Sequence, residues 1–276
     1  ASLKELSRKS NEPFFLAVGF IKPHSPYIAP KKYWDLYTPT EIGIVGETDF
    51  LEGVPKVARH GSGELRRYTD QKKTGPISND AQRRVKHAYY ACISYIDAQV
   101  GRVLEELDAQ GLRDNTIVVL WSDHGYHLGE QNLWGKTTNF ELDTRVPLIV
   151  RAPGRAGNGQ ASDALVELVD LFPSLTDLCG LPQPHELEGT GFVPLLDAPR
   201  SLWKKAAFSQ FTRGKVCGYS IRTSQSRYTE WRDRTTQEVT AKEFYIYGDE
   251  YPLESPKQAD EVPELTEAYS QQLAAG

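Results

Sequence analysis

Several features are scarce or missing in this chain of 276 residues, and each scarcity excludes a class of protein. The three cysteines, Cys92, Cys179 and Cys217, are too few and too widely spaced for a disulfide scaffold or a zinc cluster. No apolar run reaches the roughly 18 residues of a membrane-spanning helix. The 32 basic and 37 acidic residues give a net charge of −5, which excludes a generally basic nucleic-acid-binding protein.

Methionine is absent, and the chain begins at Ala1 with a polar lead-in that lacks the apolar core of a signal peptide. We therefore expect a processed product or a fragment of a longer protein. The length exceeds the usual ~100–200 residues of one domain, which predicts a single large domain or a domain with a smaller appendage. A chain of this size can bury enough surface to fold without a disulfide or a metal ion.

Short apolar runs bounded by polar loops predict three strands, at residues 13–21, 116–121 and 147–150. Continuous apolar runs of this length are typical of strands buried on both faces, as in parallel sheets. We therefore expect these strands to belong to one buried sheet.

Two helices are predicted between and after these strands. Apolar residues at three- and four-residue steps indicate a long helix that is capped by Ser78 or Asn79 and ends before Gly111. A second helix is predicted over residues 165–178, started or interrupted by Pro173. Strands that alternate with helices indicate an α/β fold with a largely parallel sheet.

The composition changes after about Leu195, where short aromatic-rich segments are separated by glycine or charged turns. This pattern predicts an antiparallel sheet followed by a closing helix over residues 264–273. The segments expected to be strands are residues 206–210, 218–222, 228–231 and 243–247. We therefore expect an α/β core over residues 1–195 and a small C-terminal α+β subdomain over residues 196–276.

Three polar loops follow or lie close to the expected core strands: residues 22–24, 122–125 and 134–139. Ligands of open α/β sheets bind beyond the carboxyl ends of the strands, so we expect these loops to meet at one edge. That edge would hold the carboxylate of Asp123, imidazoles that include those of His24 and His124, and two lysine ammonium groups.

The chemistry of these side chains points to transfer of a sulfuryl or phosphoryl group. Asp123 and His124 offer an oxygen and a nitrogen ligand to a divalent cation, although two ligands alone do not make a metal site. His24 can donate a proton to a leaving group near neutral pH. Lys22 and Lys136 are charges suited to a tetrahedral anion.

Each of these residues also has an ordinary structural interpretation. Asp-His-Gly occurs in turns, a histidine between prolines usually packs within its loop, and a single lysine is usually a solvated surface charge. Only the expected convergence of three loops favours a site. The other histidines, His60, His87, His127 and His185, have no supporting neighbours in the sequence and are interpreted as structural.

Six segments, taken in order, resemble type I sulfatases of the alkaline-phosphatase-like superfamily. They are PFFLAVGFIKPHSPY (13–27), YIDAQVGRVL (95–104), SDHGYHLGE (122–130), WGKTTNF (134–140), RVPLIVRAPG (145–154) and VELVDLFPSL (166–175). Within the family the chain is most similar to the iduronate-2-sulfatase-like group, through Lys-Pro-His, through Asp-His at the metal and through two late segments. Those segments are GYSIRT (218–223) and RYTEW (227–231).

The resemblance implies an alkaline-phosphatase-like sandwich fold and hydrolysis of a sulfate ester in a sulfated saccharide, such as an iduronate-2-sulfate-like unit, with bound Ca²⁺ or Mg²⁺. It implies that Asp123 and His124 are metal ligands and that Lys136 holds a sulfate oxygen. It further implies that His24 contacts the sulfate and assists the leaving alcohol, and that Tyr126 lines the substrate pocket.

The resemblance also implies where the protein works and what it binds. Sulfatases of this kind are extracytoplasmic, which means periplasmic or secreted in bacteria and lysosomal in animals. The expected partner is a sulfated saccharide, whereas nucleic acid and membrane are not expected partners. Lys22 is a further candidate for substrate binding.

The chain departs from the family pattern in its missing nucleophile. The family's formylglycine, its partner arginine and two further metal-binding aspartates lie in an N-terminal half that this sequence does not contain. The segment after Cys217 resembles the formylglycine signal, but Tyr219 stands where proline or alanine is required, so we interpret Cys217 as a packing residue. We therefore expect the C-terminal part of a sulfatase that needs its N-terminal half as a partner and is inactive alone.

Two alternatives remain open at this point. A phosphodiesterase or phosphonate-ester hydrolase of the same superfamily would have the same fold and a metal site built on the same principle. A non-catalytic fragment that only binds anionic glycans would also carry these motifs.

Overall fold

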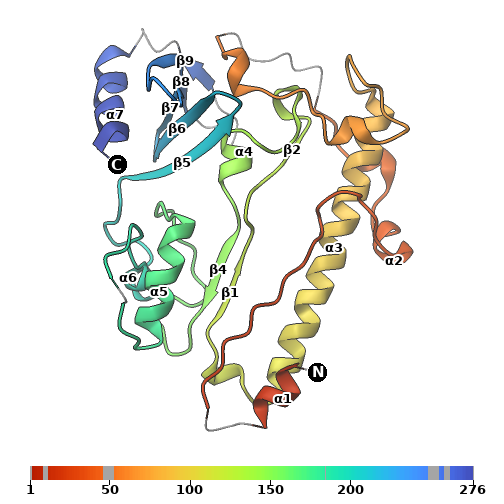
Figure 1. Cartoon of the computed structure of the whole chain (residues 1–276). Coiled ribbons are helices and arrows are strands. Elements are labelled where there is room, and N and C mark those ends of the chain that lie inside the picture. Colours follow the sequence, from red (N-terminus) through yellow and green to blue (C-terminus); the bar gives the residue numbers. More distant parts are fainter. Residues whose placement is uncertain are drawn as a thin grey trace. The chain divides into compact units, whose positions relative to one another are not determined.

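The computed structural model describes residues 2–8, 12–45, 53–183, 185–247, 255–257 and 262–275 (Figure 1). The chain forms two compact units. The first comprises Ala1–Thr48, Ser62–Ile117 and Leu128–Gly135, and the second comprises Asp49–Gly61, Val118–His127 and Lys136–Gly276. Among the described helices, none combines the length and the apolar character that crossing a bilayer requires.

The first unit is built around the long helix α3 (Asn79–Ala109). The Ser78 side chain caps this helix by accepting the N–H of Ala81 at 3.4 Å. At the other end Gly111 adopts a φ of 69°, and its N–H donates to the carbonyl of Asp108 at 2.9 Å. A left-handed glycine directly after the last turn ends a helix without the strain that a Cβ would cause. The helix predicted from Ser78 to Gly111 is confirmed.

Short elements complete the first unit around α3. Leu65, Ile77, Ala81, Val85 and Trp134 form a buried cluster, which joins the first turns of α3 to two segments distant from it in sequence. The short elements are α1 (Ser2–Ser7), α2 (Lys31–Trp34), η1 (Pro39–Glu41), η3 (Leu65–Arg67), η4 (Arg113–Asn115) and η5 (Glu130–Asn132). A two-residue ladder joins β2 (His127–Leu128) to β3 (Trp134–Gly135).

The strand predicted at residues 13–21 is wrong for this structure. The segment is extended but has no ladder partner among the described residues, and Figure 1 draws it without an arrow. The side chains of Phe15 and Ile21 are 84% and 81% exposed. An apolar run can be a buried strand only where neighbours flank it on both sides, and the described residues provide none.

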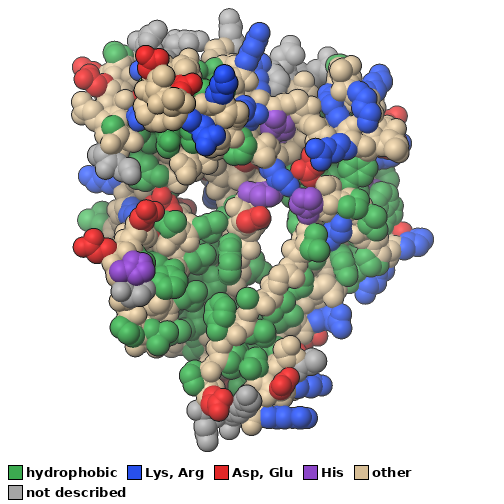
Figure 2. All heavy atoms as spheres, in the orientation of Figure 1, with side chains coloured by type: hydrophobic (Ala, Val, Ile, Leu, Met, Phe, Trp, Pro, Cys, Tyr) green, Lys and Arg blue, Asp and Glu red, His purple; other side chains and the backbone are tan. Residues whose placement is uncertain are grey.

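The second unit contains a two-stranded sheet formed by β1 (Val118–Trp121) and β4 (Leu148–Arg151). The two strands pair antiparallel, from Val118↔Arg151 to Trp121↔Leu148, so the parallel arrangement expected for this pair is wrong. Apolar runs indicate burial but do not fix strand direction, and here the chain returns without a crossover. Hydrophobic side chains gather over these strands in Figure 2. Within the two strands, Trp121 is 49% and Ile149 63% exposed.

The second unit also contains helical segments that come before, between and after β1 and β4 in the sequence. They are η2 (Lys56–Ala58), α4 (Glu141–Thr144), η6 (Leu168–Asp170), α5 (Leu171–Leu178) and α6 (Val193–Asp197). The helix predicted at residues 165–178 forms as η6 followed by α5. Pro173 lies in the first turn of α5, where its missing N–H removes no intrahelical hydrogen bond.

The C-terminal part of the second unit is an antiparallel sheet in the order β5-β6-β7-β8-β9. Its strands are β5 (Ala206–Arg213), β6 (Val216–Thr223), β7 (Ser226–Asp233), β8 (Val239–Ile246) and β9 (Ser255–Lys257). Helix α7 (Pro263–Ala275) covers one face, since Tyr269 and Leu273 pack against the buried cluster of Ile221, Tyr228 and Phe244. The predicted aromatic-rich sheet and its closing helix are confirmed.

The domain boundary expected between residues 195 and 196 stays a prediction. The second compact unit contains the β1–β4 pair and the C-terminal sheet together. The change in composition after about Leu195 nevertheless lies only a short segment before β5, which starts at Ala206.

Candidate active site

The loop that leaves β1, Ser122–Gly125, is held by hydrogen bonds to two backbone carbonyl groups. The hydroxyl of Ser122 donates to the carbonyl of His124 at 2.8 Å, and the N–H of Gly125 donates to the carbonyl of Asp143 at 2.7 Å. A Cβ on Gly125 would lie 1.9 Å from the carbonyl oxygen of Leu142. Only glycine therefore permits this loop to lie directly on α4.

Asp123 and His124 place two donor atoms next to each other. Oδ2 of Asp123 lies 3.7 Å from Nε2 of His124, and the two side chains are 84% and 39% exposed. Nδ1 of His124 lies 2.8 Å from the carbonyl oxygen of Gly125. A carbonyl only accepts, so Nδ1 carries a proton, and the tautomer of the imidazole with that proton has its lone pair at Nε2. The pair can offer one oxygen and one nitrogen ligand to a cation.

The turn that carries Lys136 is connected to this loop through Asp143, a residue of α4. One carboxylate oxygen of Asp143 accepts the N–H and the hydroxyl of Thr138 at 2.8 and 2.6 Å. The other lies 2.8 Å from Nδ1 of His127, and the His127 and Asp143 side chains are 1% and 3% exposed. The backbone carbonyl of Asp143 holds Gly125 as described above. The structural interpretation of His127 fits this buried contact, whereas no motif in the sequence distinguishes Asp143 from other acidic residues.

Asp123, His124 and Lys136 line one cavity of about 1370 Å³ in the second unit. Three of the six predicted site residues therefore line the same cavity. Tyr126 is half-buried and does not belong to the described residues that line this cavity. No cluster of three or more potential metal ligands occurs among the described His, Cys, Asp and Glu side chains.

His24 and Lys22 lie in the first unit, in a turn that is stabilised by its own carbonyl groups. Nζ of Lys22 donates to the carbonyl of His24 at 3.0 Å and to that of Pro26. Nδ1 of His24 lies 2.7 Å from the carbonyl of Ser25, which leaves Nε2 of this exposed ring directed away from the backbone. The hydroxyl of Ser25 donates to Glu64 at 2.9 Å. The meeting of this turn with the loops of the second unit stays a prediction.

A buried ion cluster anchors α4 on the C-terminal sheet. Oε2 of Glu141 lies 2.9 Å from Nε of Arg222 and 2.5 Å from Nη2 of Arg227, and the hydroxyl of Tyr247 donates to the same oxygen at 3.1 Å. Burial raises the pKa of Glu141, but Arg222 and Arg227 outweigh it and hold this pKa below its usual value. The two arginines come from the GYSIRT and RYTEW segments, whose pairing with Glu141 could not be predicted from their spacing.

A second ion cluster contains both acidic residues of the VELVD segment (166–170), Glu167 and Asp170. Nζ of Lys204 lies 2.6 Å from Glu167 and 2.6 Å from the fully buried Asp170. Asp170 and Glu167 also form a capping box at the start of η6, and Glu167 accepts the N–H of Phe208 at 2.8 Å. Burial lowers the pKa of Lys204, but the two carboxylates raise this pKa by a larger amount. The pKa of Lys204 therefore lies above its usual value. This cluster fixes α5 to β5.

Comparison with protein-family models identifies the fold that carries these loops. A model described as Sulfatase matches residues 1–181. The chain belongs to the sulfatase family. A second model, described as N-sulphoglucosamine sulphohydrolase, C-terminal, matches residues 129–252 of this sulfatase chain. The family resemblance predicted from the six segments is confirmed.

Two curated relatives of this sulfatase chain are iduronate 2-sulfatases. The protein of Mus musculus is 35% identical, in an alignment that covers 83% of this chain and 53% of the relative. The protein of Homo sapiens is 33% identical, in an alignment that covers 90% of this chain and 57% of the relative. The chain thus spans about half the length of the curated relatives it matches.

Solved structures establish the fold of this sulfatase chain. BT4656, solved in complex with its substrate D-glucosamine-2-N,6-O-disulfate, superposes with a TM-score of 0.74 at 21% identity, covering 99% of this chain and 70% of that one. The phosphonate monoester hydrolase of Agrobacterium radiobacter superposes with a TM-score of 0.76 at 23% identity, covering 99% and 59%. The predicted alkaline-phosphatase-like α/β fold is confirmed.

Proposed function

We propose that this chain carries part of the active site of a sulfuric-ester hydrolase that removes sulfate from a sulfated saccharide, such as an iduronate-2-sulfate-like unit. The observation that carries this proposal is the shared cavity of Asp123, His124 and Lys136. A divalent cation held by Asp123 and His124, together with the Lys136 ammonium group, would provide the positive charge that transfer of a sulfuryl group requires. The identity with two iduronate 2-sulfatases supports the same reaction and a uronate-containing substrate.

Asp123 and His124 would hold a divalent cation, with Ca²⁺ expected and Mg²⁺ as the alternative. The mostly exposed carboxylate and the lone pair at Nε2 of His124 fit such an ion. Calcium takes about six to eight ligands, so the others would come from the N-terminal half of the same protein, together with the formylglycine nucleophile. The bound cation would neutralise sulfate oxygens, and formylglycine would supply the attacking group.

The remaining candidate residues would act on the substrate itself. Lys136 would bind a sulfate oxygen and stabilise the charge that develops on the group being transferred. His24, whose Nδ1 is fixed by the carbonyl of Ser25, would donate the proton at Nε2 to the departing alcohol. Lys22 and Tyr126 would contact the saccharide.

The chemistry of the substrate suggests where the protein works. Sulfated saccharides are anionic and bulky, and their degradation would take place in an extracytoplasmic compartment, either the periplasm or exterior of a bacterium or the lysosome of an animal cell. Neither nucleic acid nor membrane is proposed as a partner. The isolated chain is expected to be inactive, because half of the proposed machinery is assigned to the N-terminal half.

A second candidate is hydrolysis of a phosphonate or phosphate ester. The fold similarity to phosphonate monoester hydrolases of Agrobacterium radiobacter and Silicibacter pomeroyi favours it, at TM-scores of 0.76 and 0.75. Those similarities lie at 23% and 20% identity and support the fold alone. A third candidate is a module that binds anionic glycans without turnover.

The test is turnover by the enzyme expressed from its complete gene in a host that forms formylglycine. The expected result is release of inorganic sulfate from sulfated uronate saccharides, which falls about 100-fold or more in Lys136→Ala. Asp177→Asn, which changes an exposed carboxylate of α5 outside the cavity, is the matched control. Preferred turnover of phosphonate esters would instead establish the second candidate, and calcium-dependent binding without turnover would establish the third.

A further inference from the structure

The peptide group between Thr137 and Thr138 is held at both ends by charged side chains. Its N–H donates to Oδ2 of Asp143 at 2.8 Å. Its carbonyl oxygen, on Thr137, accepts from Nη2 of Arg213 at 2.6 Å. Lys136 directly precedes Thr137, so it adjoins this doubly hydrogen-bonded peptide group.

The backbone at this point is strained. Thr137 has a φ of 84°, in the left-handed region that β-branched residues rarely adopt. Such conformations persist only when surrounding contacts determine them, and they occur where a side chain must be aimed. The contacts that determine this one are those of Asp143 and Arg213.

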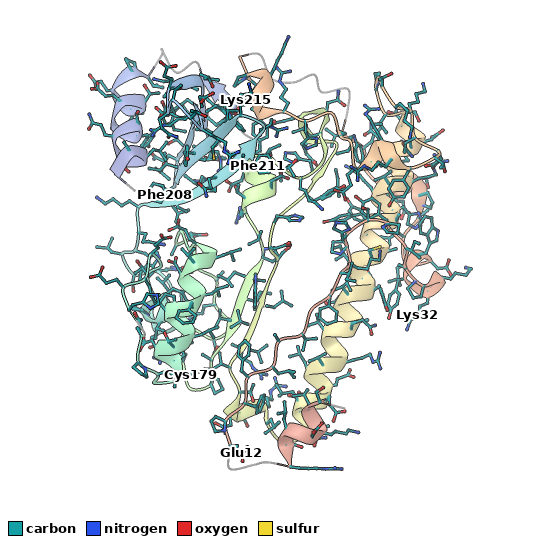
Figure 3. All side chains as sticks on the ribbon, in the orientation of Figure 1. Glu12, Lys32, Cys179, Phe208, Phe211 and Lys215 are labelled. Carbon is teal, nitrogen blue, oxygen red and sulfur yellow. The ribbon has the colours of Figure 1, made fainter. Side chains whose placement is uncertain are left out.

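Arg213 is itself fixed by its surroundings at the end of β5. Its guanidinium carbon lies 5.3 Å from the ring centre of Phe211 and 6.0 Å from that of Trp231. Figure 3 labels Phe211 on β5 and Lys215 just beyond the end of the strand. A guanidinium that lies against two aromatic rings has few alternative rotamers, so it presents its Nη2 to Thr137 in a constant geometry.

We propose that Arg213 is a positioning residue. Its hydrogen bond to the Thr137 carbonyl holds the strained backbone at Thr137 and thereby directs the Lys136 side chain into the cavity. The C-terminal sheet would then contribute to the site without touching the substrate. This inference rests on the proposed function in one respect: Lys136 is taken to be the group that binds the sulfate oxygen.

The clamp itself is tested by amide hydrogen exchange and by lysine labelling, neither of which requires turnover. In Arg213→Ala the Thr138 amide is expected to exchange about tenfold faster, and the rate at which Lys136 is methylated by formaldehyde and a borohydride is expected to change about threefold or more. Lys215→Ala, which removes an exposed cation from the adjacent turn, should leave both quantities unchanged. Arg213→Lys keeps a donor but not the planar fork and should give intermediate values.

The strain argument gives a sharper test through Thr137→Gly. Glycine adopts a φ of 84° without the steric cost of a Cβ. Arg213→Ala should therefore reduce kcat by a smaller factor in the Thr137→Gly background than in the wild type, with KM little changed in both. Equal factors in the two backgrounds would overturn the proposal.

The remaining outcomes separate this inference from the proposed function. Unchanged exchange at Thr138 and unchanged labelling of Lys136 in Arg213→Ala would overturn the inference, whatever the enzyme hydrolyses. Altered exchange and labelling in an enzyme that releases no sulfate would support the clamp and reject the sulfatase proposal. Altered exchange with unaltered labelling would show that Arg213 holds the turn without aiming Lys136, which also overturns the inference. Loss of the cooperative melting transition in Arg213→Ala would move the decision to Arg213→Lys, in which unchanged exchange, labelling and kcat overturn it.

Discussion

The buried carboxylate of Asp143 lies 2.8 Å from Nδ1 of His127. Two other groups of Asp143 reach the candidate loops: its second carboxylate oxygen holds Thr138, and its backbone carbonyl holds Gly125. Asp143 belongs to the lining of the cavity, but the side chains of His127 and Asp143 are only 1% and 3% exposed. Asp143 therefore acts as a structural link between the loop of Asp123 and the turn of Lys136.

Removing the Asp143 carboxylate should lower the free energy of unfolding. Asp143→Ala leaves three buried donors without their acceptor, and breaking a buried charged network typically lowers the free energy of unfolding by about 3–5 kcal/mol. Urea denaturation followed by tryptophan fluorescence measures this change. Asp177→Ala on α5 should lie within about 0.5 kcal/mol of the wild type. A similar small effect of Asp143→Ala would mean that the link does not stabilise the fold.

Substitutions at two glycines should change stability in opposite directions. A Cβ at Gly125 would lie 1.9 Å from the carbonyl oxygen of Leu142, so Gly125→Ala should destabilise the protein by about 1–3 kcal/mol. Gly101 lies within α3, and a Cβ there meets no atom within 4 Å. Gly101→Ala should therefore stabilise the protein by about 0.5–1 kcal/mol. Melting temperatures of the two variants, compared in one buffer, decide whether this reading of the backbone is correct.

Substitution of the proposed metal ligands should act through calcium affinity. Asp123→Asn and His124→Gln each keep the approximate shape of the side chain but weaken a donor atom. The calcium concentration for half-maximal sulfate release, measured after removal of metal with EGTA, should rise about tenfold or more in each variant. Asp177→Asn should leave it unchanged. An identical calcium dependence in all four proteins would exclude Asp123 and His124 as ligands.

Local signals in the sequence were sufficient to predict the elements that depend on local contacts. Helix α3 has a serine cap, an apolar stripe and a left-handed glycine at its end, and all three signals lie within the helix or next to it. The C-terminal sheet likewise pairs neighbouring strands through short turns, so the register depends on residues close in sequence.

Elements that depend on distant partners could not be predicted in the same way. Residues 13–21 have the composition of a buried strand, but a strand also needs neighbours, and composition does not provide them. The direction of the β1–β4 pair is set by the path of the chain between the strands. Among the candidate site residues, Asp123, His124 and Lys136 are predicted by their motifs. Asp143 and Arg213 are not, because their hydrogen bonds to Thr138 and Thr137 join residues that no motif connects.

The acid limit of stability should depend on Glu141. Burial raises its pKa, but Arg222 and Arg227 lower it more, so the folded protein holds this pKa below 4.5. A carboxylate whose pKa is lower in the folded state stabilises the fold above its unfolded pKa and loses that contribution as the pH falls. Glu141→Gln should be less stable than the wild type by about 2 kcal/mol at pH 7, because the buried Arg227 and the partly exposed Arg222 lose their anion. The difference between the two proteins should then shrink as the pH falls below 4.5, because the wild-type carboxylate takes up its proton.

Glu186→Gln, at an exposed loop position, should differ from the wild type by a small and constant amount over the same range. Urea unfolding at a series of pH values measures both differences, and a Glu141→Gln difference that stays constant with pH would contradict a lowered pKa.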